Sequence, residues 1–153
     1  RMKKNLCMLL CALLTLALLL TACSSGKAVS DFPSSLAFTV QLPDCVSDRI
    51  RYDLEEREYN GEKIQVVHAV YQGESGDSNL VTFEQMSSDS WTKMQEEGGP
   101  LPVELGTFDE GITVVMYPLQ SNPYEPDSDD AKVIDQFASE RKTITDTFTF
   151  SKQ

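Results

Sequence analysis

Polar and apolar residues alternate along most of the chain, which is typical of β-strands with one covered face. In Leu36–Pro43 (LAFTVQLP) every second residue from Phe38 is apolar, and proline ends the run. Arg49–Glu58 repeats the pattern, with apolar positions opposed by charged ones. Both segments are therefore expected to be strands.

Turn signals join further strands into pairs. Asn60-Gly61 precedes Glu62–Gln72, and Asn-Gly between extended segments is the strongest short hairpin signal. A second hairpin is expected where Asp109-Glu110-Gly111 separates PVELGTF from Ile112–Leu119. The segments Glu62–Gln72 and Ile112–Leu119 are apolar on both faces, as expected of central strands covered on both sides.

The remaining segments predict one more strand, two helices and a closing strand. Leu80–Met86 follows the expected loop GESGDSN and alternates as a strand, and Ser88–Glu97 fits a short amphipathic helix behind a serine cap. A second helix is expected to start at Asp129 or Asp130 and to run past Ile144, before DTFTF closes the chain as a strand. This order predicts an α+β fold: an antiparallel sheet of about six to seven strands packed with two helices.

The N-terminal segment has the pattern of a secretory signal peptide. Three cations, Arg1, Lys3 and Lys4, surround Met2, and an apolar run follows from Leu6 to Leu20. At about 15 residues, or roughly 22 Å of helix, this run is shorter than the about 20 residues that a spanning helix needs. Residues 1–22 are therefore expected to be removed as a signal peptide.

The end of that segment, Leu20-Thr21-Ala22-Cys23, resembles the lipobox of bacterial lipoproteins. The resemblance implies that the Cys23 thiol receives a diacylglyceryl group, that cleavage falls between Ala22 and Cys23, and that acylated Cys23 holds the protein to membrane lipid. A thiolate is the nucleophile that this chemistry requires. The alternative is a plain signal peptide with a chance cysteine.

Three regions follow from this interpretation: a signal peptide at 1–22, a lipidated flexible tether at 23–35 and a single domain at 36–153. The tether sequence SSGKAVSDFPSS is small and polar, as in flexible linkers. Cys7 and Cys11 leave with the signal peptide and Cys23 is acylated, so Cys45 has no partner for a disulfide. It is expected either as a small buried residue or as an exposed thiol.

The net charge narrows the classes of partner. The whole chain carries −11, and removal of Arg1, Lys3 and Lys4 from 13 cations leaves 10 against 24 acidic residues, a net charge of −14. Such a surface repels nucleic acid and anionic headgroups. It favours solubility, and cationic partners or divalent ions as what the surface would bind.

The segments FTVQLPD and VELGTFDEGITVVMYP, together with an acidic helix leading into ITDTFTF, resemble small uncharacterised lipoproteins of Gram-positive gut bacteria. Their pattern is also similar to the PsbP/Mog1 type of α-β-α sandwich. This resemblance implies a fold and carries no catalytic residues.

Candidate site residues are few. His68 is the single histidine and lies on an expected central strand, where it is either the centre of a catalytic arrangement or a histidine hydrogen-bonded within the sheet. The acidic turn with Asp127, Asp129 and Asp130 could ligate calcium or cap a helix, and it lacks the glycine and distal glutamate of the twelve-residue calcium loop. We expect no metal site and no cofactor.

Three aromatic residues in or beside loops, Trp91, Tyr117 and Tyr124, are candidates for ligand or partner contacts, with core packing as the alternative. No nucleophile–base pair is recognisable. The sequence therefore favours a membrane-anchored extracytoplasmic binding or accessory module of the cell envelope, which engages an envelope protein or a small ligand. A small hydrolase built around His68 and a structural or assembly factor are the alternatives.

Overall fold

The computed structural model describes residues 29–109 and 111–151, so the expected signal peptide, Ala22 and Cys23 lie outside the described residues. This part of the chain contains seven strands, three α-helices and one 3-10 helix. They run in the order β1 Phe38–Thr39, η1 Asp44–Val46, β2 Ile50–Tyr59, β3 Glu62–Gly73, β4 Gly76–Ser87, α2 Ser88–Glu97, β5 Val103–Phe108, β6 Ile112–Pro118, α3 Asp129–Glu140, α4 Lys142–Thr147 and β7 Thr149–Phe150. The predicted α+β class and number of strands are confirmed.

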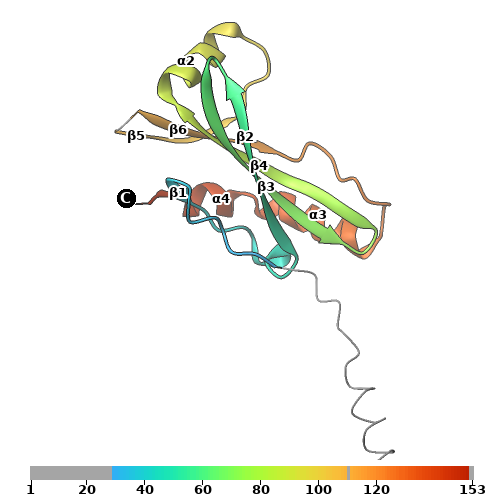
Figure 1. Ribbon diagram of the computed structural model, residues 1–153. Helices are drawn as coiled ribbons and strands as arrows, with labels where there is room; N and C mark the ends of the chain where they lie inside the picture. The colour runs from blue at the N-terminus through green and yellow to red at the C-terminus, as the bar shows by residue number, and fades with distance from the viewer. Residues whose placement is uncertain (1–28, 110, 152–153) are drawn as a thin grey trace, which may run out of the picture.

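Five of the strands form one sheet in the order β2-β3-β4-β6-β5, with every neighbouring pair antiparallel (Figure 1). The two short strands β1 and β7 pair separately, Phe38 with Phe150, and so bring the two ends of the domain together. The central position predicted for β3 is confirmed. The strand β4 is also central, since β3 and β6 flank it.

The Asn-Gly hairpin forms as predicted. Asn60 and Gly61 both have positive φ, 51° and 76°, and Tyr59 pairs with Glu62 across the turn. Two positive φ values in a two-residue loop define the turn whose twist matches that of the flanking strands.

Two expected boundaries were wrong. The expected loop at residues 73–79 is mostly strand, because Gly73 pairs with Gly76 and β4 begins there. The first strand spans only Phe38–Thr39, because its partner β7 is equally short. Beyond it, the backbone N–H of Gln41 donates to the side chain of Thr147 at 2.9 Å.

The last helix begins where the sequence predicted but is divided. Ser128 caps α3, with its hydroxyl oxygen accepting from the N–H of Ala131 at 3.1 Å. The helix ends at Glu140, and a separate short helix α4 starts at Lys142 and buries Ile144. Arg141 therefore lies at the junction of the two helices.

Apolar side chains pack on both sides of the sheet. The larger cluster lies between the sheet and the layer of β1, α3 and α4, and it includes Phe38, Tyr71, Phe83, Phe137 and Ile144. The smaller cluster lies between α2 and the sheet and consists of Trp91 of α2 with Ile64, Val66, Met86 and Val115. Since α2 has only ten residues, it covers one end of its side and leaves the other end open. No helix among residues 29–109 and 111–151 is long and apolar enough to cross a membrane.

Candidate functional site

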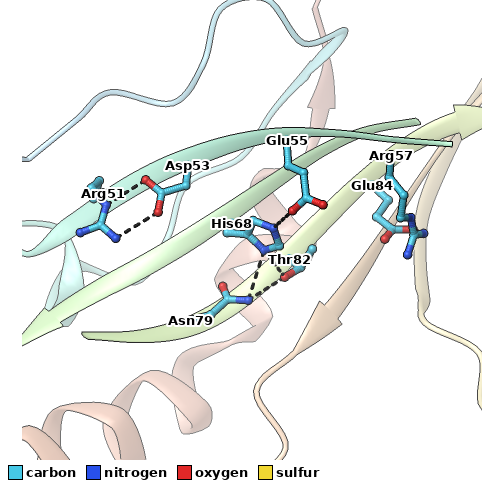
Figure 2. Close-up of polar contacts among 8 residues, drawn as sticks. All are labelled: Arg51, Asp53, Glu55, Arg57, His68, Asn79, Thr82 and Glu84. Atoms are coloured by element: carbon cyan, nitrogen blue, oxygen red, sulfur yellow. Dashed lines mark hydrogen bonds and ion pairs between the residues drawn. The ribbon is translucent and has the colours of Figure 1, made fainter. Parts of the chain in front are cut away.

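The open end of the α2 side of the sheet carries a group of polar side chains that we call the polar face (Figure 2). Cross-strand partners share a face of the sheet, and the pairs Asp53–His68 and His68–Thr82 fix the side on which this group lies. The polar face comprises Arg51, Asp53, Glu55 and Arg57 of β2, His68 of β3, and Asp77, Asn79, Thr82 and Glu84 of β4.

A β-bulge in β4 brings two of these residues together. Val70 pairs with Asn79 but Ala69 pairs with Val81, so Leu80 is an extra residue in the ladder. In a regular strand, positions 79 and 82 would point to opposite faces. The extra residue lets both side chains lie on the polar face, where the amide of Asn79 donates to the hydroxyl oxygen of Thr82 at 2.8 Å. Bulges often re-aim side chains beside functional sites.

His68 lies at the centre of a closed hydrogen-bond network. Its Nε2 is 2.9 Å from Oε2 of Glu55, and its Nδ1 is 2.9 Å from the hydroxyl of Thr82. An ionised carboxylate only accepts, so the neutral ring that fits this network carries its proton on Nε2 and accepts at Nδ1. Thr82 then donates to Nδ1, and the amide of Asn79, 3.3 Å from Nδ1, faces an acceptor as well.

Arg51 joins two carboxylates at one end of the polar face. Its Nε and Nη2 donate to the two oxygens of Asp53 at 2.8 and 3.0 Å, and its Nη1 donates to Asp77 at 2.9 Å. The hydrogen bonds from Arg51 lower the pKa of Asp53 below its usual value. A forked arginine pair of this kind fixes the geometry as well as the charge.

A buried carboxylate lies beside the α2 end. Glu84 has a side chain only 4% exposed, and its Oε2 accepts from Nη2 of Arg57 at 2.7 Å. Burial raises the pKa of Glu84 above its usual value, and the guanidinium of Arg57 only partly opposes this. Tyr117 lies next to this pair, and burial followed by the charge of Glu84 raises the pKa of its hydroxyl.

The polar face is accessible to a partner. The side chains of Arg51, Asp53, Glu55, Arg57 and Asp77 are between 36% and 55% exposed. Two arginines accompany four carboxylates, so with neutral His68 the face carries a net charge of −2. It is therefore a rigid and mildly acidic surface.

The row Glu55–His68–Thr82 has the order of an acid, a base and a hydroxyl nucleophile. Such a row needs hydrogen-bond donors aimed at the developing oxyanion. The strand β4 lies between β3 and β6, so its backbone N–H groups point to neighbouring strands rather than to the surface of the sheet. The arrangement can hold and move a proton at Thr82 but offers no backbone oxyanion hole there.

The three aromatic candidates lie in different places. Trp91 of α2 is 6% exposed and packs on the sheet, and its Nε1 donates to Glu104 at 3.0 Å. Tyr117 is half-buried at the border of the polar face, with its hydroxyl 3.8 Å from the sulfur of Met94. Tyr124 is half-buried, and its hydroxyl donates to the carbonyl of Gly76, next to Asp77, at 2.7 Å. Of the three, Tyr117 is the cross-strand partner of Thr82 and so borders the centre of the polar face.

The acidic turn is built around Asp130, which is 4% exposed. Its oxygens accept from the hydroxyl of Tyr71 at 3.0 Å and the N–H of Ser75 at 3.1 Å, while exposed Asp129 pairs with Lys132. No group of three or more potential ligands suited to a metal ion occurs among the described residues. The carboxylate of Asp130 joins α3 to the β3–β4 turn.

Cys45 is half-buried beside the larger core cluster. Burial, followed by the nearby charge of Glu140, raises the pKa of its thiol. The thiol is therefore mainly protonated at neutral pH.

Sequence reasoning identified His68 but missed its neighbours. The charged positions of β2 that alternate with apolar ones were a visible signal for Arg51, Asp53, Glu55 and Arg57. For Asn79 and Thr82 the sequence held no such signal, because their side chains meet only through the bulge.

Comparisons with known protein families, with curated proteins and with solved structures find no match to this chain.

Proposed function

We propose that this chain is a lipoprotein of the cell envelope, anchored to membrane lipid through Cys23 on the extracytoplasmic side, and that it acts as a non-catalytic binding or accessory module. The polar face is its contact surface for an envelope protein. The expected tether at 23–35 is too long at its C-terminal end, because the hydroxyl oxygen of Ser30 accepts from the N–H of Tyr52 at 2.8 Å and Phe32 packs against the larger core cluster. In this proposal the part of the tether that precedes Ser30 lets the domain present the polar face away from the bilayer.

The observation that carries the proposal is that α2 leaves one end of the sheet uncovered, and that this end is lined with fixed charges. Exposed arginine and carboxylate side chains there are already paired, as in the fork of Arg51 on Asp53. Groups held in place lose little conformational freedom on binding. Their net charge of −2 favours a partner with a basic contact surface.

A charge reversal on the polar face tests the proposal. With a photo-crosslinking residue at Asn79, membranes of the producing cell should yield one main adduct, and Glu55→Lys should lower its yield about tenfold, because a like charge then faces the basic partner. The measurement is the intensity of the adduct band after irradiation.

Asp146→Lys is the matched control. It makes the same change of charge at a side chain of the same exposure, 55%, but on α4 rather than on the polar face. The adduct should be unchanged in this variant. If both variants lower the yield equally, or if no adduct forms from Asn79, the polar face is not the contact surface.

The row Glu55–His68–Thr82 favours a second candidate, a small envelope hydrolase. If the row is catalytic, the protein should hydrolyse an activated ester. His68→Gln and Thr82→Val should then each lower the rate of hydrolysis by about 10²-fold or more. We expect equal background rates in the wild type and both variants, because β4 offers no backbone donor for the oxyanion. A matched loss of rate in the two variants would establish the hydrolase instead.

A further inference from the structure

A small pocket lies away from the polar face, between α3 and the loop that follows β6. Its volume is about 120 Å³, and apolar side chains of Leu119, Ile134, Phe137 and Ala138 form part of its lining. Arg141, at the junction of α3 and α4, lies at the same pocket. The pocket thus combines an apolar lining with a cation.

Arg141 differs from the other cationic side chains of residues 29–109 and 111–151. Each of the others donates to, or pairs with, a carboxylate or an amide oxygen: Arg49, Arg51, Arg57, Lys63, Lys93, Lys132 and Lys142. The guanidinium of Arg141 has no hydrogen bond or ion pair within the described part of the chain, although the residue is half-buried and the protein is strongly acidic. A guanidinium that contacts solvent and has no acceptor from the protein can offer its five donors to an anion.

The acidic group of the pocket is hydrogen-bonded to another residue of the pocket wall, Asn122. Asp135 also lines the pocket, but its Oδ1 accepts from the amide of Asn122 at 2.9 Å rather than pairing with Arg141. The same amide donates to the carbonyl of Ala131 at 2.8 Å, which fixes its position. The charge of Asp135 favours a ligand with a single negative charge over one with several.

We infer that this pocket binds a small monocarboxylate of about the size of butyrate. The carboxylate accepts two parallel hydrogen bonds from Arg141, and the alkyl chain lies against Phe137 and Leu119. Benzene occupies a cavity of about 150 Å³, so about 120 Å³ suits a short chain better than a ring. The inference goes beyond the proposed function and is independent of the polar face.

Calorimetric titration of the full chain in detergent micelles with sodium butyrate tests the inference. We expect saturable binding that Arg141→Gln weakens at least tenfold, roughly the loss of a bidentate charged pair. Lys142→Gln, which removes the same charge one residue away at a side chain outside the pocket, should leave the affinity unchanged. Butyramide, which has the same shape and no charge, should bind at least roughly tenfold more weakly.

A second variant keeps the test informative if Arg141→Gln folds poorly. Ala138→Leu places a larger side chain in the pocket and leaves Arg141 intact, so it should also abolish butyrate binding. Equal butyrate affinity in the wild type and Arg141→Gln, inorganic phosphate binding as tightly as butyrate, or the absence of saturable binding would each overturn the inference. None of these outcomes bears on photo-crosslinking from the polar face.

Discussion

Replacing Cys23 with alanine is expected to abolish fatty-acid labelling of the protein and to leave an uncleaved precursor. The proposed lipobox Leu20-Thr21-Ala22-Cys23 requires a thiol to receive the diacylglyceryl group, and a methyl group cannot form that bond. Two acyl chains, at about 0.8 kcal/mol per buried methylene, give stable anchoring, and none remain in the variant. Metabolic labelling and the mobility of the precursor on a gel are the measurements.

Cys45→Ala is the control, since Cys45 is the single cysteine of the described residues and lies half-buried beside the core. This variant should keep its label and its mature size. If Cys23→Ala kept its fatty-acid label and Cys45→Ala lost it, the lipid would be attached to Cys45. The proposed anchor at Cys23 would then be wrong.

Local rules predicted the parts of the fold that local chemistry determines. Asn60-Gly61 predicts a hairpin because both residues tolerate positive φ, and the structure has that turn. Asp129 and Asp130 predicted the start of the last helix because carboxylates favour the positive end of a helix dipole, and α3 begins at Asp129. The cap that Ser128 makes there was not predicted.

Where tertiary contacts decide, sequence reasoning was less successful. The glycines around Glu74-Ser75 indicated a loop, yet the turn closes directly and β4 starts at Gly76. At the other end of the chain, α3 ends at Glu140 and the helix that was expected to continue past Ile144 is divided at Arg141.

The candidate site was the least predictable part. His68 stands out because it is unique, but its partners come from two other strands, β2 and β4, and a single sequence does not define their register with β3. The bulge at Leu80 is decisive, because it brings Asn79 and Thr82 to the same face. A pattern of period two would assign them to opposite faces.

The second large effect is expected at Asp130. Asp130→Ala should lower the free energy of unfolding by about 2 kcal/mol, because it leaves the buried hydroxyl of Tyr71 without its carboxylate acceptor, and an unsatisfied buried donor costs about 1–3 kcal/mol. Tyr71 is 0% exposed, so water does not replace the lost acceptor. The N–H of Ser75 also loses its acceptor, but Ser75 is exposed and water replaces it. Urea unfolding followed by the fluorescence of Trp91 measures the change.

Asp129→Ala is the matched control, because Asp129 is the adjacent residue in the first turn of α3 but is fully exposed and pairs only with Lys132. Its effect should stay within about 0.5 kcal/mol. Equal losses in the two variants would mean that the charge at the start of the helix, rather than the buried network, provides the stability.

The effect of Asp130 should depend on pH with a defined sign. Burial alone would raise the pKa of Asp130, but hydrogen bonds from Ser75 and Tyr71 outweigh it and hold the pKa below the usual value of 3.8. A carboxylate with a lower pKa in the folded state adds stability that is complete above its unfolded pKa and is lost as the pH falls through its folded pKa. The difference between the wild type and Asp130→Ala should therefore be full at neutral pH and should shrink below about pH 3.8. A difference that grows on acidification would show that the folded protein does not hold Asp130 as a hydrogen-bonded carboxylate.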